Sequence, residues 1–189
     1  VILDDIFCQK MKARYFINKK ELATYTFDDD LDEYVRGEKR VIGQKWDDAK
    51  GFTLPLNIRM KHWVALYVDL SECNIKVYDS AIPMYRDSQM RREVEPIAVM
   101  MPMFLKHTGL FNHLGDKLEC IWPMIRVKGL VHNERSGDCG LFTYKFIEYL
   151  LRELPLEDLK EEKVADYRLE VAVGIWSEFR MKKPMSPTI

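Results

Sequence analysis

The sequence predicts an α+β fold in which helices at both ends of the chain flank a central, mostly antiparallel sheet. Apolar residues recur at helical spacing over Leu3–Phe16, and one or two helices are expected over Glu157–Phe179. Between them, Phe52–Ile58 reads as an extended segment, and the nearly continuous apolar run His62–Leu70 as a strand buried on both faces. Ile75–Asp79 alternates like a return strand. Helices separated along the chain from an antiparallel sheet are typical of the α+β class.

Length and composition indicate one globular domain. The 189 residues have a mass of 22.4 kDa; 47% are apolar and 31% charged, which excludes a disordered chain. We expect a single domain over residues 1–181 and a disordered tail over 182–189, where Pro184 and Pro187 interrupt any regular element. Because the chain begins with Val1 rather than Met, we expect it to be a fragment.

Charge and hydropathy argue against two kinds of partner. Lys and Arg number 29 against 30 Asp and Glu, a net charge of -1, so we expect no nucleic-acid partner. No apolar run approaches the roughly 18 residues of a membrane span, so we expect no membrane insertion. The four cysteines form no CxxC pair, which favours free thiols in a reducing, intracellular compartment.

Prolines shape the expectations for the middle of the chain. Arg86–His107 is expected to be helical but broken near Pro96 and Pro102, because proline lacks the N–H that continues a helix. One or two strands are expected over Leu118–Val127, around Pro123.

An acidic run occupies Asp28–Glu33. A calcium-binding loop needs glycine at its sixth position and glutamate at its twelfth, where this chain has Glu33 and Lys39. We therefore interpret the run as a solvated loop.

The nucleophile candidate is Cys139, which directly precedes a helix predicted over Gly140–Glu153. Gly137 permits unusual backbone angles, and Asp138 is a plausible N-cap. A thiol at a helix N-terminus meets the positive end of the helix dipole, which favours the thiolate, and the free N–H groups there can stabilise an oxyanion. A buried cysteine at a tight turn explains the same local pattern, so this segment alone leaves both interpretations open.

Histidine order narrows the choice of base. All four histidines precede Cys139, so the papain order of cysteine before histidine is excluded. His62 is the best candidate because it opens a predicted strand that would hold its ring rigidly. His107 and His113 lie in a stretch that looks like surface.

Asp79 is the candidate that orients His62. If the turn is centred between Ser71 and Glu72, the numbers of facing residues add to 143. His62 and Asp79 then lie on the same face as diagonal neighbours, within reach of each other. The alternative is that Asp79 only caps the turn with Ser80, a common use of aspartate after a strand.

These segments resemble the ubiquitin-like-protein-specific cysteine proteases, the SUMO proteases, in particular a plant branch that includes copies carried by transposons. The resemblance extends from about residue 2 to about residue 152. It rests on the following segments: Leu3–Asp5, Leu54–Ile58, Lys61–Asp69, Val77–Ser80 and Ser136–Phe142.

The resemblance implies a papain-like cysteine protease fold in which the order is permuted to histidine, aspartate, cysteine. His62 would be the base, Asp79 its orienting carboxylate and Cys139 the nucleophile. The family has an oxyanion-hole glutamine a few residues before the cysteine. This chain has Asn133 there, whose shorter amide can still donate, and His132 beside it.

The resemblance also implies where substrate binds. In SUMO proteases two tryptophans sandwich the diglycine tail of the substrate. Trp63 matches one of them, while Ile2 stands where the other would be. Trp46, from the loop before the sheet, could compensate for the missing ring or could simply pack in the core.

The expected function is therefore a thiol protease that cleaves after the C-terminal Gly-Gly of a ubiquitin-like protein, SUMO or a relative, in precursor processing or deconjugation. Residues 1–181 would form its catalytic domain, with no cofactor or metal and a nuclear or cytoplasmic location. Two alternatives stay open: an inactive module that binds a ubiquitin-like or other protein, and an acyltransferase on the same fold.

Overall fold

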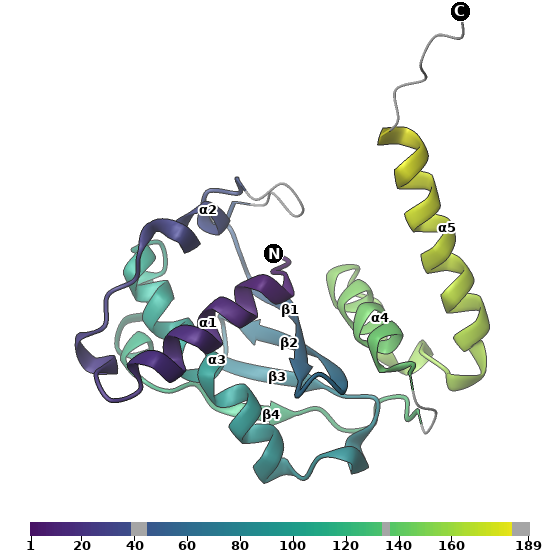
Figure 1. Cartoon of the computed structure of the whole chain (residues 1–189), viewed down its shortest axis with the longest axis horizontal. Coiled ribbons are helices and arrows are strands. Elements are labelled where there is room, and N and C mark those ends of the chain that lie inside the picture. The colour runs from purple at the N-terminus through teal and green to yellow at the C-terminus, as the bar shows by residue number, and fades with distance from the viewer. Residues whose placement is uncertain (39–44, 134–136, 183–189) are drawn as a thin grey trace, which may run out of the picture.

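The computed structural model describes residues 1–38, 45–133 and 137–182, and within them it confirms an α+β fold (Figure 1). The helices and strands, joined in places by short 3-10 turns, are α1 (Asp5–Asn18), α2 (Asp32–Val35), β1 (Gly51–Ile58), β2 (His62–Asp69), β3 (Asn74–Tyr78), α3 (Asp87–Thr108), β4 (Met124–Arg126), α4 (Cys139–Leu151) and α5 (Val164–Lys182). The predicted disordered tail overlaps the end of α5 at Lys182, and its remainder, 183–189, lies outside the described residues.

The strands form one mixed sheet in the order β1-β2-β3-β4. The first three are antiparallel, and β4, a single short strand just after Pro123, runs parallel to β3. Facing residues of β2 and β3, such as Leu66 and Val77, add to 143 throughout the hairpin, which is the register predicted from the turn. The turn therefore contains an even number of residues, and side chains whose numbers differ by an odd amount across it share a face.

Each face of the sheet has its own core. On one face, Phe52 of β1 and Val64 of β2 pack into the larger core with residues of α1 and α3, including Phe7 and Phe104. On the other face, Ala65 and Tyr78 pack against Phe142 and Phe146 of α4. Figure 1 shows α4 on the side of the sheet away from α1 and α3. Strand β2 is thus buried on both faces, as its apolar sequence predicted.

The predicted break in the long helix is wrong, because α3 runs without interruption through both prolines. Pro96 and Pro102 are buried in its apolar face, so tertiary packing offsets the missing hydrogen bonds. The carbonyl of Ala98, which would accept from residue 102 in a regular helix, instead accepts the N–H of Trp122 at 3.1 Å. Pro102 therefore leaves an acceptor that anchors the segment leading into β4.

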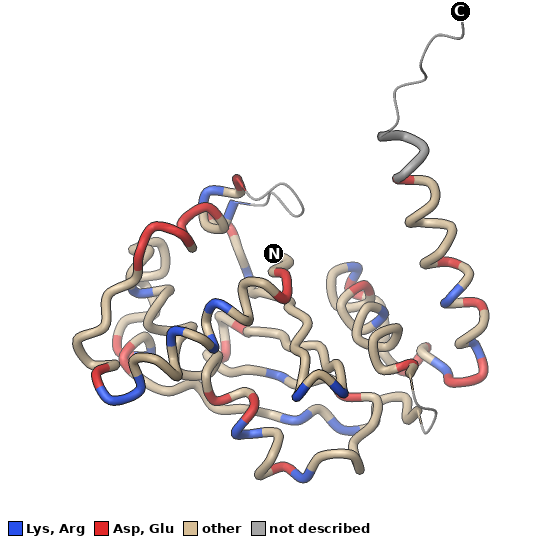
Figure 2. The backbone as a smooth tube through the Cα atoms, in the orientation of Figure 1, with Lys and Arg blue, Asp and Glu red and all other residues tan. Residues whose placement is uncertain are grey.

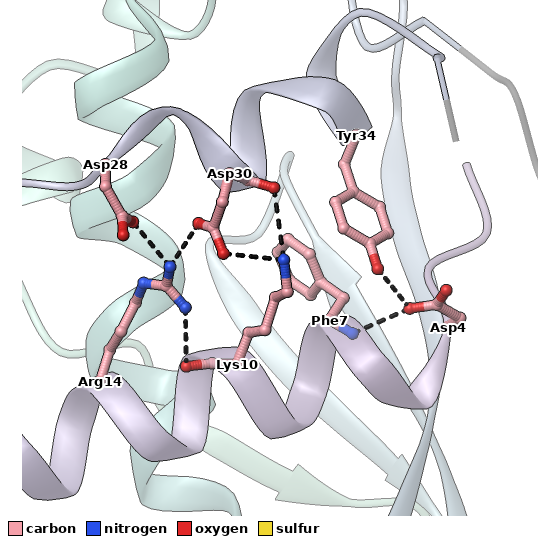
Figure 3. A network of polar contacts seen from close by, with 7 residues as sticks. All are labelled: Asp4, Phe7, Lys10, Arg14, Asp28, Asp30 and Tyr34. Carbon is pink, nitrogen blue, oxygen red and sulfur yellow. Dashed lines mark hydrogen bonds and ion pairs between the residues drawn. The ribbon is translucent and has the colours of Figure 1, made fainter. Parts of the chain in front are cut away.

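The acidic run also differs from the predicted solvated loop. It forms a 3-10 turn (Asp29–Leu31) followed by α2, and Figure 2 shows it as a concentrated stretch of negative charge. Asp28 and Asp30 both pair with Arg14 of α1 (Figure 3), and Asp30 also accepts from Lys10 at 2.7 Å. No group of three or more potential metal ligands lies together anywhere in the described part of the chain.

The same network secures the start of α1. The side chain of Asp4 caps the helix by accepting the N–H of Phe7 at 2.8 Å, and the hydroxyl of Tyr34 in α2 donates to the same carboxylate oxygen, also at 2.8 Å (Figure 3). Burial and this bond to a carboxylate raise the pKa of Tyr34.

Among the helices described here, none is long and apolar enough to cross a membrane.

We predict that Asp30→Asn lowers stability near neutral pH and reduces the loss of stability in acid. Burial opposes ionisation of Asp30, but hydrogen bonds from Lys10 and Arg14 prevail and lower its pKa from 3.8 to about 2. Its contribution is therefore present above the unfolded-state pKa and is lost as the pH falls towards the folded-state pKa. The effect is modest because 41% of the side chain is exposed.

Urea unfolding midpoints at about pH 7 and about pH 2 measure this difference. Asp29→Asn is the matched control, since Asp29 is an exposed neighbour in the same run. Equal pH profiles for the two variants would contradict the assignment to Asp30.

Candidate active site

His62 is held rigidly at the start of β2. It pairs with Ile58 across the sheet, and the residue is only 1% exposed. Its Nε2 lies 2.8 Å from Oδ1 of Asp79, and its ring stacks on that of Tyr85 with centroids 5.9 Å apart. Because Nε2 is directed at a carboxylate, Nδ1 is the ring nitrogen left to face a nucleophile.

Asp79 follows β3 directly and lies on the face of the sheet that the turn register predicted. Its Oδ1 accepts the N–H of Ala81 at 2.8 Å as well as the bond from His62, so it caps the turn and orients the imidazole at once. Burial alone would raise the pKa of Asp79, but the bonds from His62, Ala81 and Arg126 together hold that pKa below its ordinary value.

Arg126 at the end of β4 is the site residue that sequence reasoning missed. Its Nη2 donates to Oδ2 of Asp79, and its side chain is only 7% exposed. Asp79 and Arg126 lie 47 positions apart, and they meet because β3 and β4 run parallel and end at the same edge of the sheet. No local signal separates this arginine from one on an exposed strand.

Cys139 is the first residue of α4 and is partly exposed. Gly137 precedes it with a φ of 101°, a conformation that requires glycine, as predicted. Asp138 occupies the N-cap position, but its side chain makes no cap hydrogen bond; it is buried and pairs with Arg168 of α5. The predicted cap is therefore absent, and the first N–H groups of α4 are not taken up by that carboxylate.

The packing of α4 brings Cys139 to the His62 end of β2. A Cβ placed on Gly140, the next residue in α4, would lie 3.8 Å from Cδ1 of Trp63, the next residue in β2. The neighbours of the two candidate residues therefore lie close together, with room for a methyl group between them. Among the hydrogen bonds of the described residues, none joins His62 to the Cys139 sulfur, and such bonds often close only when substrate binds.

The backbone of Asn133 is bonded to the segment that follows Asp79. It is 3% exposed, and its N–H donates to the carbonyl of Ser80 at 2.8 Å, one residue after Asp79. Residues 134–136, between Asn133 and the Gly137 turn, lie outside the described residues.

The three predicted substrate contacts separate into two groups. Ile2 bridges to Thr53 of β1, and Trp63 pairs with Asn57 of the same strand, so both lie on the face that α4 covers. Trp46 is different: it is fully buried, with its ring centroid 4.3 Å from that of Phe52. This packing corrects its assignment as a substrate contact, because a residue inside the core cannot meet a peptide.

Residues 1–182 match the sequence profile of the Ulp1 protease family, C-terminal catalytic domain. The chain belongs to the Ulp1 protease family. This is a cysteine peptidase family, and no curated protein sequence gives a significant match in addition.

Solved structures of Ulp1 share the fold of this Ulp1-family domain. The C-terminal Ulp1 protease domain in complex with Smt3, the yeast ortholog of SUMO, superimposes with a TM-score of 0.61 at 15% identity, covering 89% of this chain and 63% of that one. SUMO protease Ulp1 with its catalytic cysteine oxidised to a sulfenic acid gives a TM-score of 0.62 at 15% identity, covering 94% and 68%. The chain therefore spans less than two thirds of the first structure.

We predict that the two tryptophans differ sharply in their contribution to stability. Trp46→Ala leaves a cavity in the larger core and should cost about 3–5 kcal/mol, whereas Trp63→Ala should cost less than about 2 kcal/mol because its ring is partly exposed. Urea unfolding at constant pH measures both values. Similar losses for the two variants would contradict the assignment of Trp46 to the core.

Proposed function

We propose that this Ulp1-family domain is a thiol protease that cleaves after the C-terminal Gly-Gly of a ubiquitin-like protein of the SUMO type, in precursor processing or deconjugation. The observation that carries the proposal is the buried 2.8 Å contact between His62 and Asp79, with Cys139 at the N-terminus of a helix packed beside it. A nucleophile, a base and a group that orients the base are the parts that acyl transfer from a peptide requires.

Each residue has a role in the proposed reaction. His62 accepts the proton of Cys139, and the resulting ion pair is stabilised by Asp79 and by the N-terminus of α4. The sulfur attacks the glycine carbonyl, while the backbone N–H of Cys139 and the side-chain amide of Asn133 stabilise the developing oxyanion. His62 then protonates the leaving amine, and water hydrolyses the thioester to release the enzyme.

Trp63 and Ile2 would offer apolar surface to the tail of the substrate. They share one face of the sheet, and their partners in β1, Asn57 and Thr53, are four residues apart, about 13 Å along a strand. A peptide lying along this face would meet an indole ring at one end and an aliphatic side chain at the other. One related structure holds Smt3, which agrees with a SUMO-type partner.

The cellular setting is part of the same proposal. A nuclear or cytoplasmic location would keep the four cysteines reduced and would supply ubiquitin-like conjugates. Residues 1–181 would work there as one catalytic domain.

We predict that a SUMO-type protein carrying a C-terminal electrophile modifies Cys139 covalently. Intact-mass analysis should show one adduct, which Cys139→Ala abolishes and Cys120→Ser, at the exposed cysteine, leaves unchanged. His62→Ala should slow labelling by about 100-fold or more, because the base that activates the sulfur is lost. Trp63→Ala should weaken binding of the probe, and Trp46→Phe should not.

The other outcomes of this experiment identify the alternatives. Tight binding of several ubiquitin-like proteins without any adduct would replace the proposal by a binding module. Transfer of an acetyl group from a thioester donor to a protein amine, without peptide hydrolysis, would indicate an acyltransferase.

A further inference from the structure

Arg126 donates more hydrogen bonds around this site than a residue that only completes β4 would need. We propose that it is a positioning residue for the peptidase reaction, which locks the Asp79 carboxylate and the Tyr85 segment against His62 through a single buried guanidinium. The inference rests on the proposed function and deepens it. Its basis is the set of bonds from Arg126, whose side chain is 7% exposed, to the Asp79 carboxylate, which bonds His62, and to the backbone of Tyr85, whose ring stacks on His62.

Arg126 restrains the rotation of the Asp79 carboxylate. Oδ1 of Asp79 serves His62 and the N–H of Ala81, while Oδ2 accepts from Nη2 of Arg126. With both oxygens bonded on opposite sides, the carboxylate cannot turn away from the imidazole. The side chain of Asp79 has no solvent exposure, so without the guanidinium Oδ2 would have to find a new partner or rotate towards water.

Arg126 also fixes the segment whose aromatic ring stacks on the imidazole. Nη1 of Arg126 donates to the carbonyl of Tyr85 at 2.8 Å and to Asp87 at 3.0 Å, and Nη2 donates to the carbonyl of Ile82 at 2.9 Å. These bonds fix the loop between β3 and α3, and the ring of Tyr85 in that loop stacks on His62. One residue therefore controls both the carboxylate bonded to the ring and the aromatic surface stacked on it.

The shape of a guanidinium suits these acceptors better than the shape of an ammonium does. A planar guanidinium presents several N–H groups in a fixed fork, which matches acceptors on two sides, whereas a lysine ammonium is a compact point charge. The charged and titratable groups around the cluster are Asp79, His62 and Asp87, with Tyr85 and Arg59 at its edge. We therefore expect lysine to replace arginine poorly.

A double-mutant cycle tests the inference. Arg126→Gln should lower kcat/KM for a SUMO-type fluorogenic substrate by about 10- to 100-fold, and Arg126→Lys should restore only part of it. In an Asp79→Asn background, Arg126→Gln should change kcat/KM by less than about 3-fold, because the group it positions is already altered. Added guanidinium should partly rescue Arg126→Gln and leave Asp79→Asn unaffected.

The matched control is Arg14→Gln, which removes the arginine of α1 that pairs with Asp28 and Asp30. It should lower stability without changing kcat/KM. Additive losses in the cycle, or a folded Arg126→Gln enzyme with unchanged kcat/KM, would overturn the positioning role.

A second measurement does not depend on activity. The imidazole N–H proton of His62 that bonds to Asp79 should give a downfield NMR signal in the wild type and in Arg14→Gln, and should shift or broaden in Arg126→Gln. Retention of that signal in Arg126→Gln would refute the inference. A wild-type chain that shows the signal and its loss in Arg126→Gln, yet never reacts with any ubiquitin-like probe, would refute the proposed function instead.

Discussion

The hydrogen bond between His62 and Asp79 ties together the two ends of the β2–β3 hairpin, and the rest of the site is arranged around it. The even-numbered turn places both residues on one face of the sheet, and the flanking cores hold the strands in that register. A slip of one residue would turn the carboxylate to the face of α4. The same apolar packing that stabilises the sheet therefore also aims the imidazole.

Burial of the His62–Asp79 pair carries a desolvation penalty and also restricts the pair to one geometry. Asp79 gives up water entirely, and it stays ionised because His62, the Ala81 N–H and Arg126 replace that water. A desolvated carboxylate with three fixed donors has one geometry rather than several. Cys139 contrasts with this cluster, since it is partly exposed at a helix terminus, as the proposed attack on a peptide requires. In the proposed site, the pair of His62 and Asp79 is buried, and the cysteine proposed to react is partly exposed.

Local sequence patterns were sufficient to predict those features that depend on neighbouring residues alone. The turn chemistry gave the hairpin register and hence the pairing of His62 with Asp79, and the glycine before Cys139 has the positive φ expected of it. Long-range partners were beyond reach: the bond from Arg126 to Asp79 spans 47 positions, and Asp138 pairs with an arginine of a later helix. The ion pairs of Asp28 and Asp30 with Arg14 and Lys10 of α1 likewise join residues that are distant in the sequence.

Pro102 is unfavourable for the hydrogen bonding of α3 but leaves free an acceptor that the segment before β4 uses. Because it cannot donate to the turn before it, the carbonyl of Ala98 remains open and receives Trp122, and the chain enters β4 from that point. β4 in turn ends with Arg126. With alanine at this position, the backbone N–H of residue 102 could bond to the Ala98 carbonyl and compete with Trp122 for it. Restoring the regular hydrogen bonds of α3 would thus weaken the anchor of the segment that leads into β4.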